Sequence, residues 1–226
     1  KPNLLYHNNG DGTFTKILSG EIVSDLGSSI SGSWGDYDND GYLDLFVTNN
    51  TDSKNKLYHN NGDGTFTSIT NSPIVDQGIY SHSAAWGDYN KDGHLDLVVS
   101  DFHATHFNFL FKGDGTGGFV TDDASVVSQS AKSSVGVAWA DYDNDGDLDL
   151  FIANTNGENN QLFRNDVGVF VEITTGAIVN DGGNSVGGVW GDYDNDGDLD
   201  LFVTNSSVSE ANLFYENNGD ESFTKI

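Results

Sequence analysis

The stretch that decides the fold is residues 36–44, DYDNDGYLD, in which four aspartates occur within nine positions and no lysine or arginine intervenes. Like charges at such spacing repel each other by about 1 kcal/mol per pair in water, and by more at the lower effective dielectric of a protein. A bound cation is the natural counter-charge, so the stretch predicts a metal-binding loop.

The same pattern recurs at residues 88–96, 141–149 and 192–200, and we name the four copies acidic loops 1 to 4 in chain order. A tryptophan precedes each copy, and successive tryptophans are 52, 53 and 51 residues apart: Trp34, Trp86, Trp139 and Trp190. A repeat of such constant length predicts stacked, equivalent structural units.

Each unit is expected to contain four short antiparallel strands. In the first unit the strand-like stretches are residues 30–34, 43–47, 56–59 and 65–69. The Asn-Gly and Asp-Gly steps of residues 60–64 suit a tight hairpin between the last two strands. No stretch has apolar residues at helical spacing, so we expect almost no helix and an all-β class.

Four-stranded units with a period of roughly fifty residues are typical of a β-propeller, whose sheets are called blades. We expect one domain over residues 1–226, with an amino-terminal half blade and four complete blades at residues 3–17, 28–70, 80–122, 133–175 and 184–226. The half blade repeats residues 212–226, which predicts either a piece of a longer propeller or a ring closed between copies of the chain.

Calcium is the expected metal in the acidic loops. It takes about six to eight hard oxygen ligands, and alternate residues of a curled loop can direct their carboxylates to one centre while glycine permits the sharp turn. Magnesium requires stricter octahedral geometry, and zinc favours nitrogen or sulfur ligands. An EF-hand is excluded because it needs a roughly twelve-residue loop between helices.

We expect side chains from loop positions one, three, five and nine and a backbone carbonyl from position seven, which gives about four calcium ions. Loop 2 is expected to bind calcium most weakly because Asn90 replaces an aspartate and Lys91 adds a positive charge. The expected ligands are Asp36, Asp38, Asp40, Tyr42 and Asp44; Asp88, Asn90, Asp92, His94 and Asp96; Asp141, Asp143, Asp145, Asp147 and Asp149; and Asp192, Asp194, Asp196, Asp198 and Asp200.

The repeats resemble the FG-GAP/VCBS family of integrin-α-like, calcium-binding β-propellers, especially the bacterial extracellular type. The resemblance rests on residues 34–47, on the run NNGDGTFT at residues 60–67 and on their further copies. It implies calcium in the loop between the first two strands of a blade and a ring of about seven or eight blades. Two hairpins depart from the pattern, at residues 110–119, where the turn is lengthened, and at residues 165–170.

The composition excludes several classes of partner. The chain has 35 acidic and 9 basic residues, and its net charge of −26 disfavours nucleic acid and anionic membrane surfaces. No apolar run is long enough to be inserted into a membrane, and the absence of cysteine excludes disulfides. Calcium sites of the extracellular kind would be nearly empty in cytosol, so we expect an extracellular location, secreted or at the cell surface.

A carbohydrate or protein partner is expected on one particular face. In a four-stranded meander the acidic loops and the last hairpins share one face, and the opposite face carries the variable loops. Those loops are residues 50–55, 101–108, 155–160 and 205–211. Four side chains of the second loop could stack on a sugar ring or hold a metal, with an ordinary packed loop as the alternative: Phe102, His103, His106 and Phe107.

A catalytic role has little support for the histidines outside that loop. His59 and His7 occupy a repeat position that holds Lys112, Arg164 and Glu216 in the other units, and such exchange predicts exposure to solvent.

Three functions fit the sequence. The first is a calcium-stabilised module for binding or adhesion, and the second is a structural subunit of an extracellular assembly or filament that self-associates through open blade edges. The third is the propeller domain of a polysaccharide lyase-type enzyme. We expect no enzymatic activity, because no Ser-His-Asp arrangement or phosphate-binding glycine loop occurs and the aspartates are accounted for by the metal sites.

Overall fold

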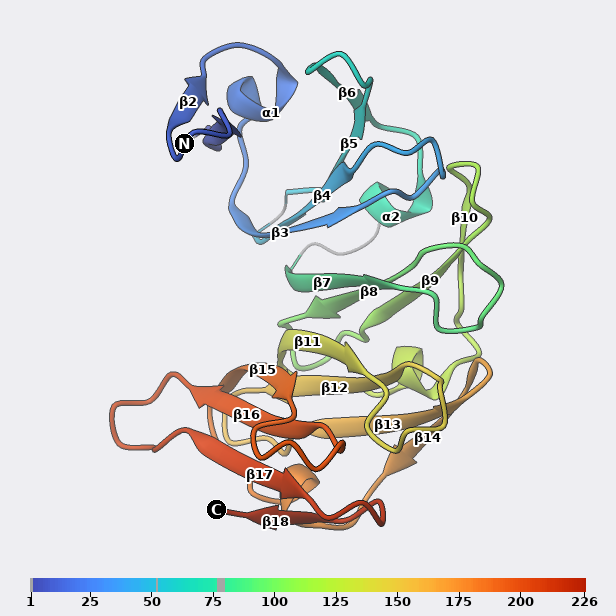
Figure 1. The fold of residues 1–226 in the computed structure, drawn as a ribbon, viewed down its shortest axis with the longest axis vertical. Helices are drawn as coiled ribbons and strands as arrows, with labels where there is room; N and C mark the ends of the chain where they lie inside the picture. The colour runs from blue at the N-terminus through green and yellow to red at the C-terminus, as the bar shows by residue number, and fades with distance from the viewer. Residues whose placement is uncertain (1, 52, 77–79) are drawn as a thin grey trace.

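The computed structural model describes residues 2–51, 53–76 and 80–226, which form an all-β fold. In this part of the chain a two-stranded sheet is followed by four four-stranded antiparallel sheets (Figure 1). The strands of each sheet are hydrogen-bonded in chain order, so each sheet is a simple meander. The predicted all-β class with four-stranded antiparallel units is confirmed.

We number the four-stranded sheets 1 to 4 along the chain. The preceding two-stranded sheet contains β1 (Leu5–Asn8) and β2 (Phe14–Ile17). Sheet 1 contains β3 (Ser29–Gly35), β4 (Asp44–Asn49), β5 (Lys56–Asn60) and β6 (Phe66–Ile69). Sheet 2 contains β7 (Ser81–Gly87), β8 (Asp96–Asp101), β9 (Phe109–Gly113) and β10 (Phe119–Thr121). Sheet 3 contains β11 (Ser134–Ala140), β12 (Asp149–Asn154), β13 (Gln161–Asp166) and β14 (Val169–Ile173). Sheet 4 contains β15 (Ser185–Gly191), β16 (Asp200–Asn205), β17 (Leu213–Asn217) and β18 (Phe223–Lys225).

Single helical turns lie in the connections that lead into the four sheets: α1 (Glu21–Ser24), α2 (Pro73–Asp76), η1 (Val126–Gln129) and η2 (Ala177–Val179). The expectation of almost no helix missed these turns. Each turn buries apolar side chains against a sheet, for example Ile74 and Val127. One turn is too short to show the helical spacing of apolar residues, so the sequence pattern could not reveal it.

The last hairpin of sheet 2 does not have a lengthened turn, so that prediction was wrong. Gly113 pairs with Phe119 as Asn60 pairs with Phe66 in sheet 1, which leaves five residues between the partners in both cases. The hairpin of sheet 3 is shorter. Asp166 pairs with Val169, and the two residues between them both have positive φ, 46° and 86°, as a type I′ turn requires.

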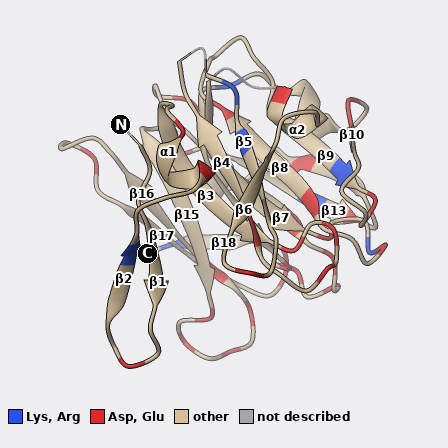
Figure 2. Cartoon of the chain, turned by 90° about the horizontal axis from the view of Figure 1, so that it is seen from above, with Lys and Arg blue, Asp and Glu red and all other residues tan. Residues whose placement is uncertain are grey.

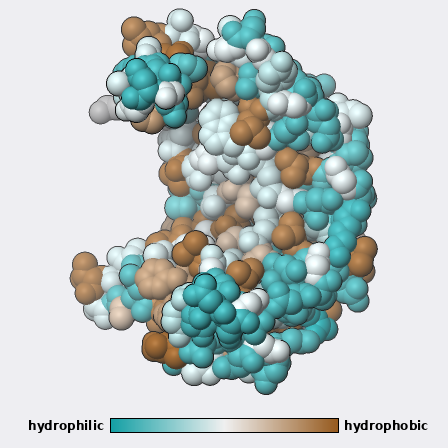
Figure 3. Space-filling view, in the orientation of Figure 1, coloured by the Kyte–Doolittle hydropathy of each residue, from teal (hydrophilic) through white to brown (hydrophobic). Residues whose placement is uncertain are grey.

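The four sheets fan out along an arc. The first strands of successive sheets, β3, β7, β11 and β15, lie next to one another. The arc is open on one side, with β1 and β2 at one end and sheet 4 at the other (Figure 1). The space-filling view shows the same side hollowed (Figure 3). This arrangement is consistent with consecutive propeller blades.

Aromatic residues form a contact that recurs between adjacent sheets. The tyrosine of one acidic loop stacks on the tryptophan of the next sheet, and the ring centroids of Tyr37 and Trp86 are 6.3 Å apart with the planes at 14°. The two following interfaces repeat this stack. Gly35 permits the close approach, because a Cβ atom at this position would lie 2.7 Å from the Trp86 ring.

The stacked tyrosines are expected to contribute more to stability than their exposed counterpart. Tyr142 is 1% exposed and stacks on Trp190. Tyr142→Ala should lower the free energy of unfolding by about 3 to 5 kcal/mol. Tyr193 has the same repeat position but is 53% exposed, so Tyr193→Ala is the matched control and should cost less than about 1 kcal/mol. Urea denaturation followed by tryptophan fluorescence measures both. Equal losses would show that the stack does not join the sheets.

Candidate metal centre

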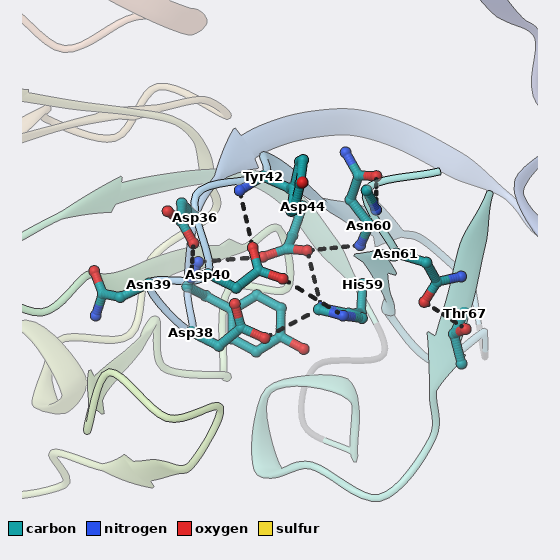
Figure 4. Close-up of polar contacts among 12 residues, drawn as sticks. Asp36, Asp38, Asn39, Asp40, Tyr42, Asp44, His59, Asn60, Asn61 and Thr67 are labelled. Carbon is teal, nitrogen blue, oxygen red and sulfur yellow. Dashed lines mark hydrogen bonds and ion pairs between the residues drawn. The ribbon is translucent and has the colours of Figure 1, made fainter. Parts of the chain in front are cut away.

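The last aspartate of each acidic loop anchors the loop to its own sheet. In loop 1 the Asp44 carboxylate accepts the Asn60 N–H from β5 at 2.7 Å and the Tyr37 N–H at 3.3 Å (Figure 4). The equivalent carboxylates in the other loops, Asp96, Asp149 and Asp200, accept the same two kinds of backbone N–H. All four are at most 2% exposed, so the loops end on buried charges.

Burial makes ionisation of these anchors unfavourable. It raises the pKa of Asp44 to about 6 and the pKa values of Asp96 and Asp149 to about 7, against the lowering effect of the backbone hydrogen bonds. In loop 3 burial also raises the pKa of Asp143, and the neighbouring Asp145 charge adds to the effect. A bound cation would favour the charged forms.

The first aspartate of each loop closes the turn. Asp36 accepts the N–H groups of Asp40 and Gly41, both at 3.0 Å, and Gly41 has a φ of 91°, which glycine adopts without strain. Asp88 and Asp192 close loops 2 and 4 in the same way. The loop is therefore curled by its own carboxylate, as the position of the glycine predicted.

The carboxylates of three loops converge as a cation site requires. Among the described residues, ligand oxygens within 4.8 Å of one another come from positions one, three and nine of loops 1, 3 and 4: Asp36, Asp38 and Asp44; Asp141, Asp143 and Asp149; Asp192, Asp194 and Asp200. Oδ1 of Asp38 and Oδ1 of Asp141 are buried and accept no hydrogen bond. Hard, crowded and partly unpartnered oxygens fit calcium.

Acidic loop 2 differs from the other three. Asn90 donates its amide Nδ2 hydrogen to Asp96 at 3.0 Å, so an internal hydrogen bond replaces a contact between two carboxylates. Lys112 on β9 places its ammonium 3.0 Å from Asp92. The Lys112 ammonium neutralises part of the charge of the loop from within the chain, and the uncharged Asn90 amide occupies an oxygen of Asp96. They support the expectation that loop 2 binds calcium most weakly, which stays a prediction. The Lys91 charge, on which the expectation also rested, is directed to Asp147 of loop 3 instead.

Adjacent acidic loops contact each other. The fourth residue of each of the first three loops reaches the seventh residue of the next loop: Asn39 Nδ2 lies 3.3 Å from His94 Nδ1, the Lys91 ammonium pairs with Asp147, and Asn144 donates to Asp198 at 2.7 Å. Figure 2 shows several acidic residues in loops at the lower end of the strands and others over the rest of the chain. The carbonyls of Tyr42, His94, Asp147 and Asp198 stay predicted ligands.

His59 is not directed to solvent, so that prediction was wrong. Its side chain is 26% exposed and lies among the carboxylates of loop 1, with Nδ1 3.1 Å from Asp38 Oδ2 and 3.3 Å from Asp44 Oδ1 (Figure 4). Because His59 precedes Asn60, whose N–H binds Asp44, its position in β5 brings it to the loop. His7, at the same repeat position in β1, is exposed as predicted.

The variable loops form a shallow pocket of about 360 Å³ from three sheets. Phe102 and His103 line it with Tyr80, together with Asn50, Thr51, Ala104, Ser133 and Asn156. His103 and His106 stack with ring centroids 4.4 Å apart, and Tyr80 lies 5.2 Å from His103. Phe107 instead pairs with Ala131 in an isolated bridge. The structure thus brings together three of the four predicted side chains.

Sequence reasoning missed Tyr80, whereas Asn50, Thr51 and Asn156 lie in variable loops that were predicted to face the ligand. Tyr80 immediately precedes β7 and its backbone carbonyl accepts the Phe102 N–H at 2.9 Å, which holds it beside the loop that was predicted. Thr51 and Asn156 hold equivalent places, two residues after the ends of β4 and β12. Their repeat position was visible in the sequence, but the convergence of three loops depends on the curvature of the arc.

A family model described as an FG-GAP-like repeat matches residues 1–47, 36–99, 101–152 and 141–203. Cartilage acidic protein 1 of Homo sapiens is 31% identical over 187 residues, which cover 78% of this chain and 28% of that protein. The Xenopus tropicalis protein of the same name is 34% identical over 180 residues, which cover 74% of this chain and 27% of that protein. The chain spans less than a third of the length of these relatives.

Among solved structures, a lectin of Agrocybe aegerita matches with a TM-score of 0.62 and 19% identity, covering 98% of this chain and 59% of that one. That lectin is described as specifically recognising non-reducing terminal N-acetylglucosamine. At this identity the likeness concerns the fold. The family model and the curated relatives are non-enzymatic kinds of protein. In the described ranges no helix is long and apolar enough to span a membrane.

The buried anchors predict a pH dependence of the metal-free protein. The pKa of Asp149 is about 7 in the folded state, against about 3.9 for an unperturbed aspartate. The folded state therefore binds this proton more tightly than the unfolded state. The stability that results is fully present below about pH 4 and is lost as the pH rises to about 7.

Asp149→Asn removes this titration. In a buffer with chelator, we expect the free energy of unfolding to fall less between pH 5 and pH 8 for Asp149→Asn than for the unchanged protein. Urea denaturation at each pH gives the two slopes. If the slopes are identical, the ionisation of Asp149 does not oppose folding.

Proposed function

Because the chain belongs to the FG-GAP-like repeat family, we propose that it is a calcium-stabilised extracellular β-propeller module that binds a carbohydrate or a protein with its variable-loop face. The four sheets would be consecutive blades of the ring. The observation that carries the calcium proposal is the repeated convergence of three carboxylates on one point, with the last of them buried.

The calcium proposal is supported by the unfavourable electrostatics of the acidic loops when they hold no cation. Three clustered aspartates repel one another, and burial penalises ionisation of the ninth aspartate in at least three of the loops. A divalent ion held by hard oxygens offsets both effects. In loop 1 the ion would be held by Asp36, Asp38 and Asp44, and Asp40 lies beside them.

The proposed location follows from calcium supply. Extracellular calcium modules have dissociation constants of about 10⁻⁴ to 10⁻³ M, so they are filled at millimolar calcium and nearly empty in cytosol. At the tighter end of that range, each site would add about 1 to 2 kcal/mol of stability in millimolar calcium. A chain with net charge −26 would be folded most stably where calcium is plentiful.

The proposed ligand face is supported by the pocket between three variable loops. Aromatic rings such as those of Tyr80 and Phe102 offer flat apolar surface for a sugar ring, and the amides of Asn50 and Asn156 offer hydrogen bonds. The structural neighbour that recognises N-acetylglucosamine favours carbohydrate over protein as the first ligand class to test.

A second candidate function is a structural subunit that self-associates, and exposed aromatics at the two ends of the arc favour it. Trp34 in sheet 1 is 47% exposed and Tyr193 in sheet 4 is 53% exposed, whereas their counterparts stack inside the arc. In this case the end sheets of two copies would meet. The stoichiometry measured below separates the two candidates.

We expect calcium binding to be unequal among the loops. Native mass spectrometry with increasing calcium should show three ions bound first, at loops 1, 3 and 4, and a fourth only at higher calcium. Asn90→Asp should bring the fourth ion to lower calcium, because it restores a carboxylate and removes the amide hydrogen bond to Asp96.

The matched control is Asn39→Asp, which adds the same charge at a position where the side chain points to the neighbouring loop. It should not add a tighter site. Absence of any bound calcium at millimolar concentration would overturn the proposal. A calcium-loaded monomer would favour the binding module, and a calcium-loaded oligomer would favour the structural subunit.

Carbohydrate binding is tested on an immobilised glycan array in calcium buffer. We expect binding to be lost in Phe102→Ala, because the ring lines the pocket, and retained in Phe107→Ala, which removes an exposed aromatic of the same loop outside the pocket. Binding that is equally weakened by the two changes, or absent for every glycan, would count against carbohydrate and shift the test to protein partners.

A further inference from the structure

The outermost strands of the four sheets differ in how their free edges are protected. Such an edge can add a strand from another chain, and proteins prevent this with short edge strands, lysine, or cover from a neighbouring segment. β10 and β18 contain only three residues each, and β18 carries Lys225. In sheet 1 the preceding helical turn caps the edge, because the Glu21 carboxylate accepts the N–H of Ser68 on β6.

The edge of β14 in sheet 3 is less protected. β14 is the longest of the four outermost strands, it contains no lysine, and it lies on the outer side of the arc (Figure 1). Beside it, η1 has Val126 at the repeat position of Glu21, so no carboxylate can cap the edge. Val169 pairs with Asp166 across a two-residue turn, and backbone groups alternate in an antiparallel ladder. The N–H and C=O groups of Phe170 and Glu172 are therefore directed to the free edge.

The same hairpin exposes three valines. Val167, Val169 and Val171 are between 50% and 66% exposed. Val169 and Val171 share one face of β14, whereas Phe170 between them is buried and packs on Tyr89 with ring centroids 5.4 Å apart. The strand is thus held to the sheets by one face and presents apolar side chains to solvent on the other.

The turn of this hairpin keeps a valine where the backbone disfavours it. Val167 has a φ of 46° and is the one apolar residue among the described non-glycine residues with positive φ. A β-branched side chain is strained in this region, whereas asparagine before glycine would suit the type I′ turn. Because the Val167 side chain is exposed, packing within the chain does not explain it. A strained and exposed apolar residue is typical of a surface that contacts a partner.

We propose that β14 and its turn form a docking edge for an extended segment of a partner protein, which adds a fifth strand to sheet 3. The backbone groups of Phe170 and Glu172 pair with the segment, and the exposed valines contact apolar side chains at its alternate positions. The variable-loop pocket contains no residue of this hairpin. The proposal therefore does not rest on the function proposed above.

Charge selects the kind of segment. The chain has a net charge of −26, Glu172 lies within β14, and the Val167 N–H donates to the Asp147 carboxylate of acidic loop 3 at 3.0 Å. A segment with lysine or arginine between its apolar residues is attracted to such an edge. A second copy of the chain would bring a further charge of −26, so repulsion disfavours pairing of β14 with β14 of another copy.

The test is the binding of a fluorescent peptide to the full chain, followed by anisotropy. The peptide has about eight residues, in which valine alternates with lysine and threonine. We expect it to bind and to slow amide hydrogen exchange at Phe170 and Glu172, because their N–H groups become paired. A peptide with proline at the positions whose N–H would face β14 should not bind, since proline has no donor. A peptide with glutamate in place of lysine should bind much more weakly.

Two changes at one repeat position locate the binding edge. Val171→Thr introduces the residue that sheets 1 and 4 have there, Thr67 and Thr224, so the fold should be kept. It should weaken binding of the lysine peptide by about fivefold, because one apolar cross-strand contact is lost. Val120→Thr is the matched control: Val120 is exposed at the same repeat position but belongs to a three-residue strand, so binding should not change.

Val167→Asn tests the strained turn. It should raise the urea midpoint of unfolding, because asparagine suits the type I′ turn, and it should weaken binding of the lysine peptide, because an apolar contact is removed. Failure of the lysine peptide to bind, equal binding of the proline peptide, or equal effects of Val171→Thr and Val120→Thr would overturn the proposal. Dimers of the unliganded chain with slowed exchange at Phe170 and Glu172 would also overturn it, in favour of a second copy as the occupant.

Discussion

The buried carboxylate that ends each acidic loop is the constraint on which the rest of the structure depends. Asp44 receives one N–H from within its loop and one from the third strand, so a single side chain joins the loop and two strands. This is a costly place for a charge, because burial favours the neutral acid. The backbone N–H donors offset part of this unfavourable energy, and a bound calcium ion, as proposed above, would offset more of it. The repeated motif follows from this need for charge compensation.

The same loop also joins one sheet to the next. The residue after its first aspartate is a tyrosine, whose N–H reaches the buried carboxylate and whose ring stacks on the following tryptophan. Side chains at the fourth position extend to the next loop. Order in a loop is therefore tied to packing between sheets. A cation that orders one loop would stabilise the neighbouring interface as well as its own sheet.

The sequence predicted the strands and loops well because the repeat made each local pattern visible four times. Apolar runs, Asp-Gly turns and the spacing of tryptophans all indicated four-stranded sheets. The helical turns escaped notice, because α2 needs only Ile74 and Val75 as its apolar face. Tyr80 escaped as well, since its place in a pocket depends on how three loops converge in space. Interactions within a unit could be predicted, whereas those set by the arc could not.

The error at His59 shows how comparison between repeats can mislead. Exchange of histidine, lysine, arginine and glutamate at one position suggested solvent, yet three of these side chains interact with an acidic loop or its tyrosine. Apart from Asn90 in loop 2, the surrounding carboxylates are constant, so the variable residue changes the local charge beside each loop. Lys112 brings a positive charge to loop 2, and His59 contacts the carboxylates of loop 1. Variation next to a repeated site therefore distinguishes copies whose backbones are alike.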